Sequence, residues 1–448
     1  MELKMSNIFK IIMLISGLYC CDVFAHSNEQ NEQSYWKVHP KTAKELKLMQ
    51  GYSLSSDRQI TAGNFDRGVN PRWSFLHMTE LFPHARIDRA AETIPLKYSM
   101  GSLNVAEISF SATDGNEHKV KELLYHTSTD SFLVMYKGSL IHESYYNGMN
   151  ANTPHLLMSV TKTFTAMLVG ILVEQGKLDT KKRVTDYLPE LGNTGLTGAT
   201  VQQVLDMSAA LKYSEDYTDL KADVYIEGCV FSWSTPLGCK PGPETFEAYI
   251  QTLKEKSQGN GEKFHYRSVL TNVLAMLIER TSGDRMVNML NKHVWQKLGM
   301  VDDGYFNVDS VGFAFAGGGL SATARDVMRF GSVLLNNGQY KGEQIIPEDW
   351  IKDTRFANAL TKDNFAKGEY GEILPGWHYR NQTWVKDSEE GVMLALGVHG
   401  QLIYVNQNTQ LVIVKQSSQP EATNLNMFLD TFAALDAIST ALALQDKN

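Results

Sequence analysis

The chain has 448 residues, of which 43% are hydrophobic and 21% are charged, and its formal net charge at pH 7 is -8. This length and composition are typical of a globular protein with a large core in one or two domains, and they exclude a fibrous or disordered chain. Acidic residues outnumber basic ones and no basic cluster offsets them, which argues against nucleic acid or an anionic membrane surface as a partner.

The N-terminus has the pattern of a secretory signal peptide. Lys4 and Lys10 precede an apolar run over residues 11–21, and a short segment ending at Ala25 follows. The run is too short to span a bilayer comfortably, and no later segment is long and apolar enough to do so. We therefore expect residues 1–25 to be removed on export to the periplasm or the medium.

The four cysteines fall into two pairs. Cys20 and Cys21 lie within the apolar run, where lipid attachment is the weaker alternative to cleavage because bulky Tyr19 precedes them. Once the leader is removed, Cys229 and Cys239 remain as an even pair in an oxidising compartment, which predicts a disulfide.

Residues 26–120 precede the main domain, which we place at 121–448. Trp73, Phe75 and Phe82 indicate that this N-terminal extension packs on the core. The main domain is predicted to contain five strands and a final helix around a helix-rich middle. The predicted strands are 132–136, 140–145, 392–396, 402–405 and 411–414, and the helix is 424–444.

Ser159 and Lys162 stand three residues apart at the head of an apolar run that continues to Leu172. On a helix these two side chains share one face, so the amine can reach the hydroxyl. A lysine with its ordinary pKa of about 10.4 accepts a proton at neutral pH only if burial depresses that pKa, and the apolar run favours burial. The alternative is an N-cap serine with a solvated lysine, as expected for the second Ser-x-x-Lys, Ser34 to Lys37.

A variable-looking segment, residues 212–262, separates this motif from the next. It is rich in acidic and aromatic residues and contains both late cysteines, Cys229 and Cys239. Such a segment is either a lid that selects the substrate or a surface loop that a disulfide stabilises, and the sequence leaves both interpretations open.

Two further elements follow. Tyr266 precedes a second apolar helix, and His399-Gly400 interrupts a strand-like run. The order and spacing of the three elements resemble the penicillin-recognising serine hydrolases, which include class C β-lactamases, DD-peptidases, esterases and 6-aminohexanoate-dimer hydrolases. The resemblance covers residues 121–440.

Departures from the family pattern narrow the expected activity. Ser268 stands where many relatives have asparagine, and Val398-His399-Gly400 stands where β-lactamases have Lys-Thr-Gly. The cation that holds a β-lactam or peptide carboxylate is thus missing. The pattern looks more like the 6-aminohexanoate-dimer hydrolase and esterase branch, which implies an amidase or esterase for small substrates.

The resemblance implies a mechanism. Ser159 would attack a carbonyl while Lys162 and Tyr266, as phenol or phenolate, relay the proton to the leaving group. The backbone N–H groups of Ser159 and Gln401 would hold the oxyanion. His399 would bind the substrate or Tyr266, although a histidine in such a place is often merely packed.

The fold implied is α+β, of the α/β sandwich type, with a five-stranded antiparallel sheet flanked by helices and an inserted helical subdomain. No cofactor is implied, and the twelve histidines are too scattered to indicate a metal site. A β-lactamase or DD-peptidase is the alternative activity, and a catalytically silent binding protein of the same fold is the second alternative.

Overall fold

The computed structural model describes residues 34–99 and 103–445. The described residues from Tyr35 onward form one compact unit, and the expected signal peptide lies outside the described residues. The N-terminal extension from Tyr35 belongs to the same compact unit as the main domain, while a boundary at residue 120 stays a prediction.

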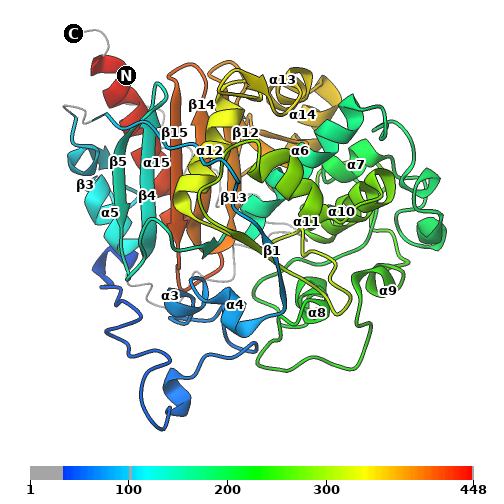
Figure 1. Cartoon of the computed structure of the whole chain (residues 1–448), viewed down its shortest axis with the longest axis horizontal. Coiled ribbons are helices and arrows are strands. Elements are labelled where there is room, and N and C mark those ends of the chain that lie inside the picture. Colours follow the sequence, from blue (N-terminus) through cyan, green and yellow to red (C-terminus); the bar gives the residue numbers. More distant parts are fainter. Residues whose placement is uncertain (1–33, 100–102, 446–448) are drawn as a thin grey trace, which may run out of the picture. The chain divides into compact units, whose positions relative to one another are not determined.

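The main sheet has seven antiparallel strands rather than five, in the order β11-β12-β13-β14-β15-β4-β5 (Figure 1). The five expected strands are contiguous in it, and β11 and β12 extend it at one edge. The strands are β4 (Thr129–Tyr136), β5 (Ser139–Tyr145), β11 (His378–Arg380), β12 (Thr383–Asp387), β13 (Val392–Gly397), β14 (Gln401–Asn406) and β15 (Leu411–Ser417).

The two missed strands carry polar residues that are nonetheless buried. Arg380 of β11 is buried because its guanidinium pairs with Asp206 at 2.6 Å and with Asp353 at 2.8 Å. Asn381 and Gln382, with φ of 49° and 57°, form the two-residue turn between the strands. The sequence of β11 and β12 therefore lacks the hydrophobic pattern expected of buried strands, because ion pairing of Arg380 replaces apolar burial.

Helices cover both faces of the main sheet. Neighbouring strand residues point to opposite faces. Ile403 of β14 meets Gly331 of α12 (Ala324–Leu335), whereas Tyr404 lies near Ser439 of α15 (Leu425–Gln445). The sheet is thus sandwiched as expected, with α5 (Val120–His126) beside α15.

The final helix corrects one expectation. Among the described residues, α15 is long and apolar enough to cross a membrane by length and composition, although we expected no such segment. Its inner side is nevertheless buried on the protein, and it includes Asp430, which accepts hydrogen bonds from Tyr35 and Trp36 at 2.6 and 3.1 Å. These contacts are those of a core helix.

The helix-rich middle lies beside the main sheet (Figure 1) and is centred on the pair α6 and α10, which pack against each other. Its helices are α6 (Thr161–Glu174), α7 (Val201–Leu205), α8 (Asp223–Val230), α9 (Phe246–Ile250), α10 (Val269–Ser282), α11 (Met286–Leu290), α13 (Glu348–Phe356) and α14 (Ala359–Ala366).

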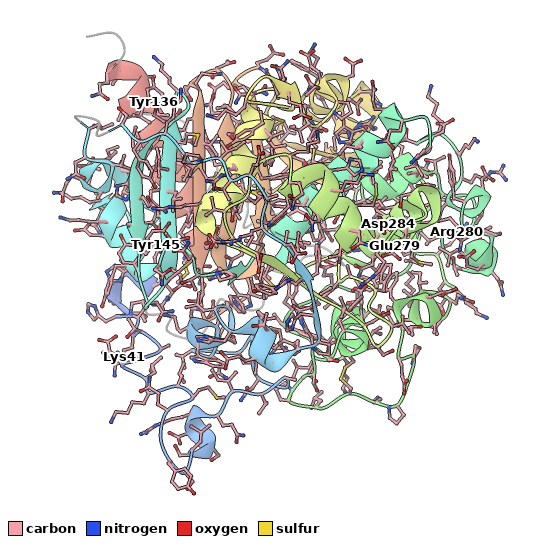
Figure 2. All side chains as sticks on the ribbon, in the orientation of Figure 1. Lys41, Tyr136, Tyr145, Glu279, Arg280 and Asp284 are labelled. Carbon is pink, nitrogen blue, oxygen red and sulfur yellow. A yellow bond between two sulfur atoms is a disulfide. The ribbon has the colours of Figure 1, made fainter. Side chains whose placement is uncertain are left out.

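The end of α10 follows from local chemistry. Gly283 adopts φ 74°, the left-handed conformation that ends helices. Figure 2 shows Glu279, Arg280 and Asp284 gathered at this end. Glu279 accepts the backbone N–H of Met286 at 2.9 Å, and Arg280 pairs with Glu190 at 2.6 Å. These contacts fix the C-terminal end of α10 and the direction in which the chain leaves it.

A smaller antiparallel sheet, in the order β1-β7-β8-β6, includes β6, the strand that precedes the first motif. Its strands are β1 (His84–Ile87), β6 (His155–Leu156), β7 (Gly304–Asn307) and β8 (Leu320–Ala322), and two short hairpins pair β2 (Ser109–Ser111) with β3 (Glu117–Lys119) and β9 (Gln339–Tyr340) with β10 (Glu343–Gln344).

The N-terminal extension contributes α3 (Pro71–Ser74) and α4 (Met78–Leu81). Phe75 and Phe82 are buried in one apolar cluster with Leu156 and Met158, the residues that lead to Ser159. Part of the extension therefore packs against the residues that lead to the first motif.

Candidate active site

Ser159 lies in a short helical turn, η4 (Met158–Val160), between β6 and α6. The preceding Met158 has φ 47°, which is uncommon for a residue with a side chain. The backbone N–H of Leu157 donates to Leu320 of β8 at 2.8 Å, which anchors the approach to the turn. Ser159 is 9% exposed, so it is largely shielded from solvent. It lies just before the N-terminus of α6.

Lys162 reaches Ser159 as the spacing predicts. Its Nζ donates to Oγ of Ser159 at 2.7 Å and to the carbonyl oxygen of Gly317 at 2.6 Å. Every residue of α6 from Thr161 to Leu172 is buried. Burial lowers the pKa of the Lys162 amine to about 8, against the opposing charges of Glu215 and Glu227.

Tyr266 completes the group. Its ring centroid lies 5.1 Å from Nζ of Lys162. Burial raises the pKa of the Tyr266 phenol well above its usual value, with Glu215 acting in the same direction and a hydrogen bond with Ser159 acting against it. Of the phenol and the phenolate that the sequence left open, this direction of the pKa shift favours the neutral phenol.

Ser268 immediately precedes α10 and is held by a carboxylate that the sequence did not single out. Glu215 accepts the backbone N–H of Ser268 at 2.5 Å and its hydroxyl at 2.6 Å. Tyr217 also donates its hydroxyl to Glu215 at 2.6 Å. The acidic character of residues 212–262 was the signal available, but only the fold brings Glu215 to the second motif.

A second buried carboxylate, Glu227, is connected to Lys162 through Asn272 and Gly317. Asn272 donates to Glu227 at 2.8 Å and accepts the N–H of Gly317 at 3.0 Å, and the carbonyl of Gly317 in turn accepts from Lys162. Burial raises the pKa of Glu227 to about 7. This chain of contacts fixes the Gly317 carbonyl that orients the amine.

A glycine three residues before the expected third motif lies close to the nucleophile. A Cβ on Gly397, at the end of β13, would lie 3.1 Å from the backbone nitrogen of Ser159, whereas a Cβ on Gly400 would meet Gln419 and Ser417. Of these two glycines, Gly397 is therefore the one that lies beside the Ser159 nitrogen. The His-Gly turn, η8 (Val398–Gly400), drew attention because its residues break the strand pattern, but β13 ends before it.

His399 and Gln401 have structural contacts. Nδ1 of His399 lies 2.7 Å from the carbonyl oxygen of Gln419, and burial lowers the pKa of His399 to about 4. Gln401 is paired with Gly397 in the sheet, and its side chain donates to the Ser417 carbonyl at 2.5 Å. These contacts account for both side chains without a substrate.

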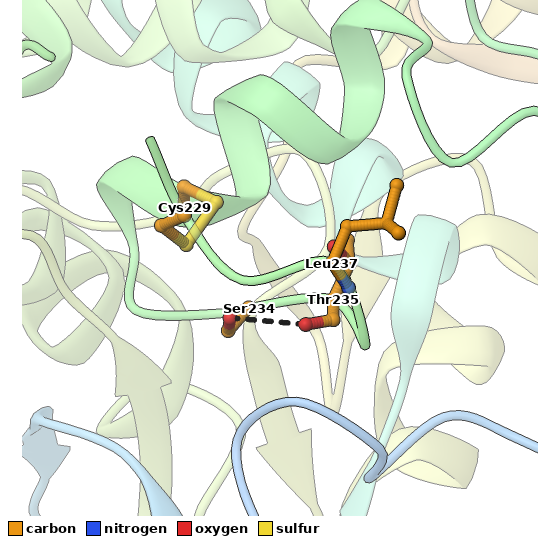
Figure 3. The surroundings of a disulfide bond; sticks show 5 residues. Cys229, Ser234, Thr235 and Leu237 are labelled. Atoms are coloured by element: carbon orange, nitrogen blue, oxygen red, sulfur yellow. Dashed lines mark hydrogen bonds between the residues drawn. A yellow bond between two sulfur atoms is a disulfide. The ribbon is translucent and has the colours of Figure 1, made fainter. Parts of the chain in front are cut away.

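Cys229 and Cys239 have their sulfur atoms 2.12 Å apart, at bonding distance (Figure 3). Between them, Trp233 packs its ring 5.0 Å from Phe65 of the extension and 4.8 Å from Phe315, two residues before Gly317. The segment 229–239 therefore links the extension to the wall of the site.

Within the part of the chain that the structure describes, no group of three or more His, Cys, Asp or Glu side chains could hold a metal ion. The chemistry available at the site is that of an activated hydroxyl, an amine, a phenol and backbone N–H groups.

Comparisons with known proteins agree with this geometry. A model of the Beta-lactamase family matches residues 116–437. The 6-aminohexanoate-dimer hydrolase of Paenarthrobacter ureafaciens is 33% identical over 397 residues, a match that covers 86% of this chain and 97% of that protein.

Solved structures extend the comparison. A Bacillus anthracis protein, provisionally assigned as a 6-aminohexanoate-dimer hydrolase, has a TM-score of 0.78 at 27% identity. The match covers 87% of this chain and 99% of that protein's chain. EstCE1, a hydrolase with promiscuous acyltransferase activity, shares the fold with a TM-score of 0.55 at 18% identity, over 69% of this chain and 93% of its own. The chain belongs to the beta-lactamase family and is a serine hydrolase.

Proposed function

We propose that this enzyme cleaves amide or ester bonds of small substrates through an acyl-enzyme on Ser159, in the manner of a 6-aminohexanoate-oligomer hydrolase or an esterase. The observation that carries the proposal is the 2.7 Å contact between Nζ of Lys162 and Oγ of Ser159. Because burial brings the pKa of Lys162 to about 8, a sizeable fraction of the amine is free to take the hydroxyl proton near neutral pH.

The reaction runs in two halves. Oγ of Ser159 attacks the carbonyl carbon as its proton passes to Lys162, and a tetrahedral oxyanion forms. Tyr266, as a phenol, donates its proton to the leaving nitrogen or oxygen and recovers one from Lys162. The carbon–heteroatom bond then breaks, and water attacks the acyl-enzyme by the same route in reverse.

Two backbone N–H groups hold the oxyanion in this proposal. One belongs to Ser159 and the other to Val398, the residue after Gly397. Support comes from Gly397 itself, since only a residue without Cβ leaves room beside the Ser159 nitrogen. Val398 replaces Gln401 here because Gln401 is paired with Gly397 inside the sheet.

The preference for simple amides or esters rests on a missing cation. With Gly397 as the glycine of the third motif, the position of the β-lactamase lysine falls on Ala395, which is apolar and 1% exposed. A β-lactam or peptide carboxylate thus lacks its usual partner. The dimer hydrolase activity of the Paenarthrobacter ureafaciens relative is consistent with a linear amide as substrate.

The experiment pairs a covalent probe with a substrate panel. Intact-mass spectrometry after treatment with a fluorophosphonate is expected to show one adduct, which is absent from Ser159→Ala. A short-chain p-nitrophenyl ester and the linear 6-aminohexanoate dimer are expected to be turned over faster than nitrocefin. Faster turnover of nitrocefin would favour a β-lactamase, and no adduct and no turnover would favour a silent binding protein.

Export is part of the proposal. It is supported by the leader pattern over residues 1–25 and by the bonding distance between Cys229 and Cys239. The mass of the protein purified from the exported fraction is expected to correspond to a chain that starts at His26 with both cysteines oxidised. A full-length, reduced chain in the cytoplasmic fraction would contradict it.

A further inference from the structure

Arg67, in the N-terminal extension, has a guanidinium group with unused hydrogen-bond donors. Its Nε and Nη2 are buried and have no hydrogen-bond partner. Nε lies 3.2 Å from Oδ1 of Asp66, but without the alignment of a hydrogen bond, and that oxygen is unpartnered too. The Arg67 side chain as a whole is 30% exposed. Because buried donors without acceptors destabilise a fold, a ligand oxygen that reaches this group is favoured.

The guanidinium lies over an aromatic ring that is connected to the second motif. Cζ of Arg67 is 4.6 Å from the ring centroid of Tyr225, on α8. The hydroxyl of Tyr225 donates to the carbonyl oxygen of Tyr217 at 2.9 Å. The hydroxyl of Tyr217 in turn donates to Glu215, the carboxylate that holds Ser268. Arg67 is therefore linked to the site through the segment that carries Glu215.

Arg67 is also near the wall of the site formed by the disulfide loop. Phe65, two residues earlier, packs its ring 5.0 Å from that of Trp233, which lies 4.8 Å from Phe315. Nε1 of Trp233 is a further buried N–H without an acceptor. Burial, and to a lesser degree the charge of Arg67, lowers the pKa of His399 in the turn η8. The extension and the loop thus each bring unpaired N–H groups to this side of the site.

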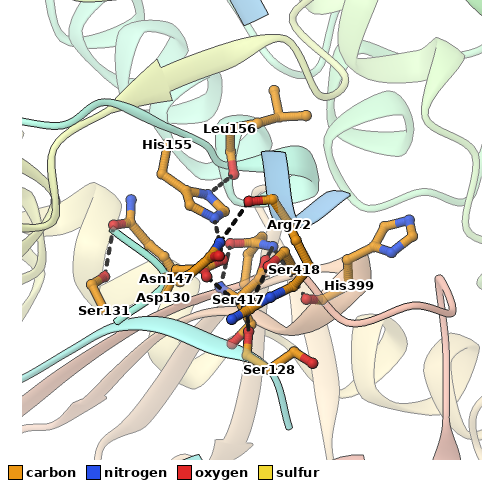
Figure 4. Close-up of polar contacts among 12 residues, drawn as sticks. Arg72, Ser128, Asp130, Ser131, Asn147, His155, Leu156, His399, Ser417 and Ser418 are labelled. Atoms are coloured by element: carbon orange, nitrogen blue, oxygen red, sulfur yellow. Dashed lines mark hydrogen bonds and ion pairs between the residues drawn. The ribbon is translucent and has the colours of Figure 1, made fainter. Parts of the chain in front are cut away.

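The extension holds Arg67 on a fixed support. Arg72, on α3, donates through Nη1 to Asp130 of β4 at 2.8 Å (Figure 4). Ser74, on the same helix, donates to the carbonyl oxygen of Phe65 at 2.6 Å. The backbone next to Arg67 is therefore tied to the main sheet, as a preorganised binding residue requires.

We propose that Arg67 is a specificity-determining residue that binds a carboxylate at the far end of the substrate's acyl chain, so that the preferred substrates are small half-amides or half-esters of dicarboxylic acids. It supplies from the extension the positive charge that the third motif lacks at Ala395. A guanidinium suits this role because it stays charged and presents paired donors to a carboxylate. The inference rests on the proposed function of Ser159.

The acyl part is assigned to Arg67 because the leaving group is directed elsewhere. In the proposed reaction Tyr266 protonates the leaving atom, and its ring packs 6.0 Å from Tyr379 of β11 and 5.7 Å from Trp384 of β12. Arg67 lies instead against α8. The acyl chain, bonded to Oγ of Ser159 in the acyl-enzyme, is thus the part that extends toward Arg67.

Two esters with the same leaving group and the same six-carbon acyl chain test the proposal in the wild-type protein. They are the 4-nitrophenyl monoester of adipic acid, which ends in a carboxylate, and 4-nitrophenyl hexanoate, which ends in a methyl group. After subtraction of uncatalysed hydrolysis, kcat/KM is expected to be about tenfold higher for the adipate ester, the effect of one charge-assisted hydrogen bond. The ratio is expected to fall as salt is added. Equal kcat/KM values for the two esters would overturn the proposal.

Variants assign the preference to Arg67. Arg67→Met keeps the apolar stem and is expected to bring the adipate-to-hexanoate ratio to about one, whereas Arg67→Lys keeps the charge and part of the preference. The matched control is Arg58→Met, because Arg58 follows Asp57 in the same extension as Arg67 follows Asp66, with its Nε 3.9 Å from that carboxylate. Loss of the preference in both methionine variants, or in neither, would refute the role of Arg67. Hexanoate turnover shows that each variant is folded.

A third ester tests the assignment to the acyl chain. In 4-nitro-3-(hexanoyloxy)benzoic acid the carboxylate is on the leaving group, and Arg67→Met is expected to change its kcat/KM no more than that of the hexanoate ester. A larger loss with this ester than with the adipate ester would refute the assignment. If wild-type protein hydrolyses none of the esters and gives no fluorophosphonate adduct, the proposed function of Ser159 fails instead.

Discussion

Gly397 lies directly against the backbone of Ser159, so that a Cβ at position 397 would stand 3.1 Å from the Ser159 nitrogen and 2.8 Å from the Leu157 carbonyl oxygen. This contact joins the end of the main sheet to the turn that holds the nucleophile. The space left by the missing side chain is where the oxyanion of the proposed reaction would form.

Gly397→Ala is therefore expected to lower kcat for ester hydrolysis about 100-fold, because the added methyl group displaces the oxyanion. The melting temperature is also expected to fall, because the Leu157 carbonyl must move away from the new Cβ. Steady-state kinetics and thermal denaturation measure the two effects. Gly192→Ala is the matched control, since a Cβ there meets nothing within 4 Å. Equal loss of activity in both variants would contradict the role of Gly397.

Lys162→Met is expected to abolish hydrolysis and to raise the stability of the fold. Burial lowers the pKa of this amine from 10.5 to about 8, so keeping it charged in the folded state costs up to about 3 kcal/mol. The folded chain binds fewer protons than the unfolded chain between these values. The gain in the variant is therefore present below pH 8 and disappears as pH rises toward 10.5. Denaturant titrations at several pH values measure it, and a variant less stable than wild type at neutral pH would contradict the account.

The sequence predicted the parts of the fold that depend on local pattern. Ser159, Lys162 and the apolar run of α6 could be placed because helical spacing alone brings the amine to the hydroxyl. Strands β11 and β12 could not be predicted, because Arg380 is buried by ion pairs with distant Asp206 and Asp353. Glu215 likewise gains its role only when the fold brings residue 215 to residue 268.

The close approach of Gly397 to Ser159 could not be predicted either, for a related reason. The His-Gly turn is conspicuous in the sequence, whereas Gly397 is one small residue at the end of an apolar strand. Its importance comes from a close approach to Ser159, more than two hundred residues earlier in the chain. Sequence spacing does not report such an approach.

Glu215→Gln is expected to move the acidic limb of the kcat/KM profile to lower pH. The Glu215 charge raises the pKa of Lys162, so its removal leaves the amine deprotonated at lower pH. The glutamine oxygen can still accept from Ser268, which keeps α10 capped. Glu190→Gln, which removes a half-buried carboxylate paired with Arg280, is the control. A limb that moves to higher pH, or moves equally in both variants, would speak against the coupling of Glu215 to Lys162.

Replacing Cys229 and Cys239 together by serine separates the two interpretations of residues 212–262. The bond closes a short loop, with a sequence separation of 10, so its loss is expected to cost about 2 kcal/mol of unfolding free energy. Trp233 within this loop packs against Phe315 beside the site. We therefore also expect the ratio of kcat/KM for the short ester to that for the linear amide to change several-fold. Wild-type protein treated with dithiothreitol should show both changes. If only the unfolding free energy falls and the ratio of kcat/KM values stays constant, the segment is a surface loop stabilised by the disulfide and the lid interpretation is wrong.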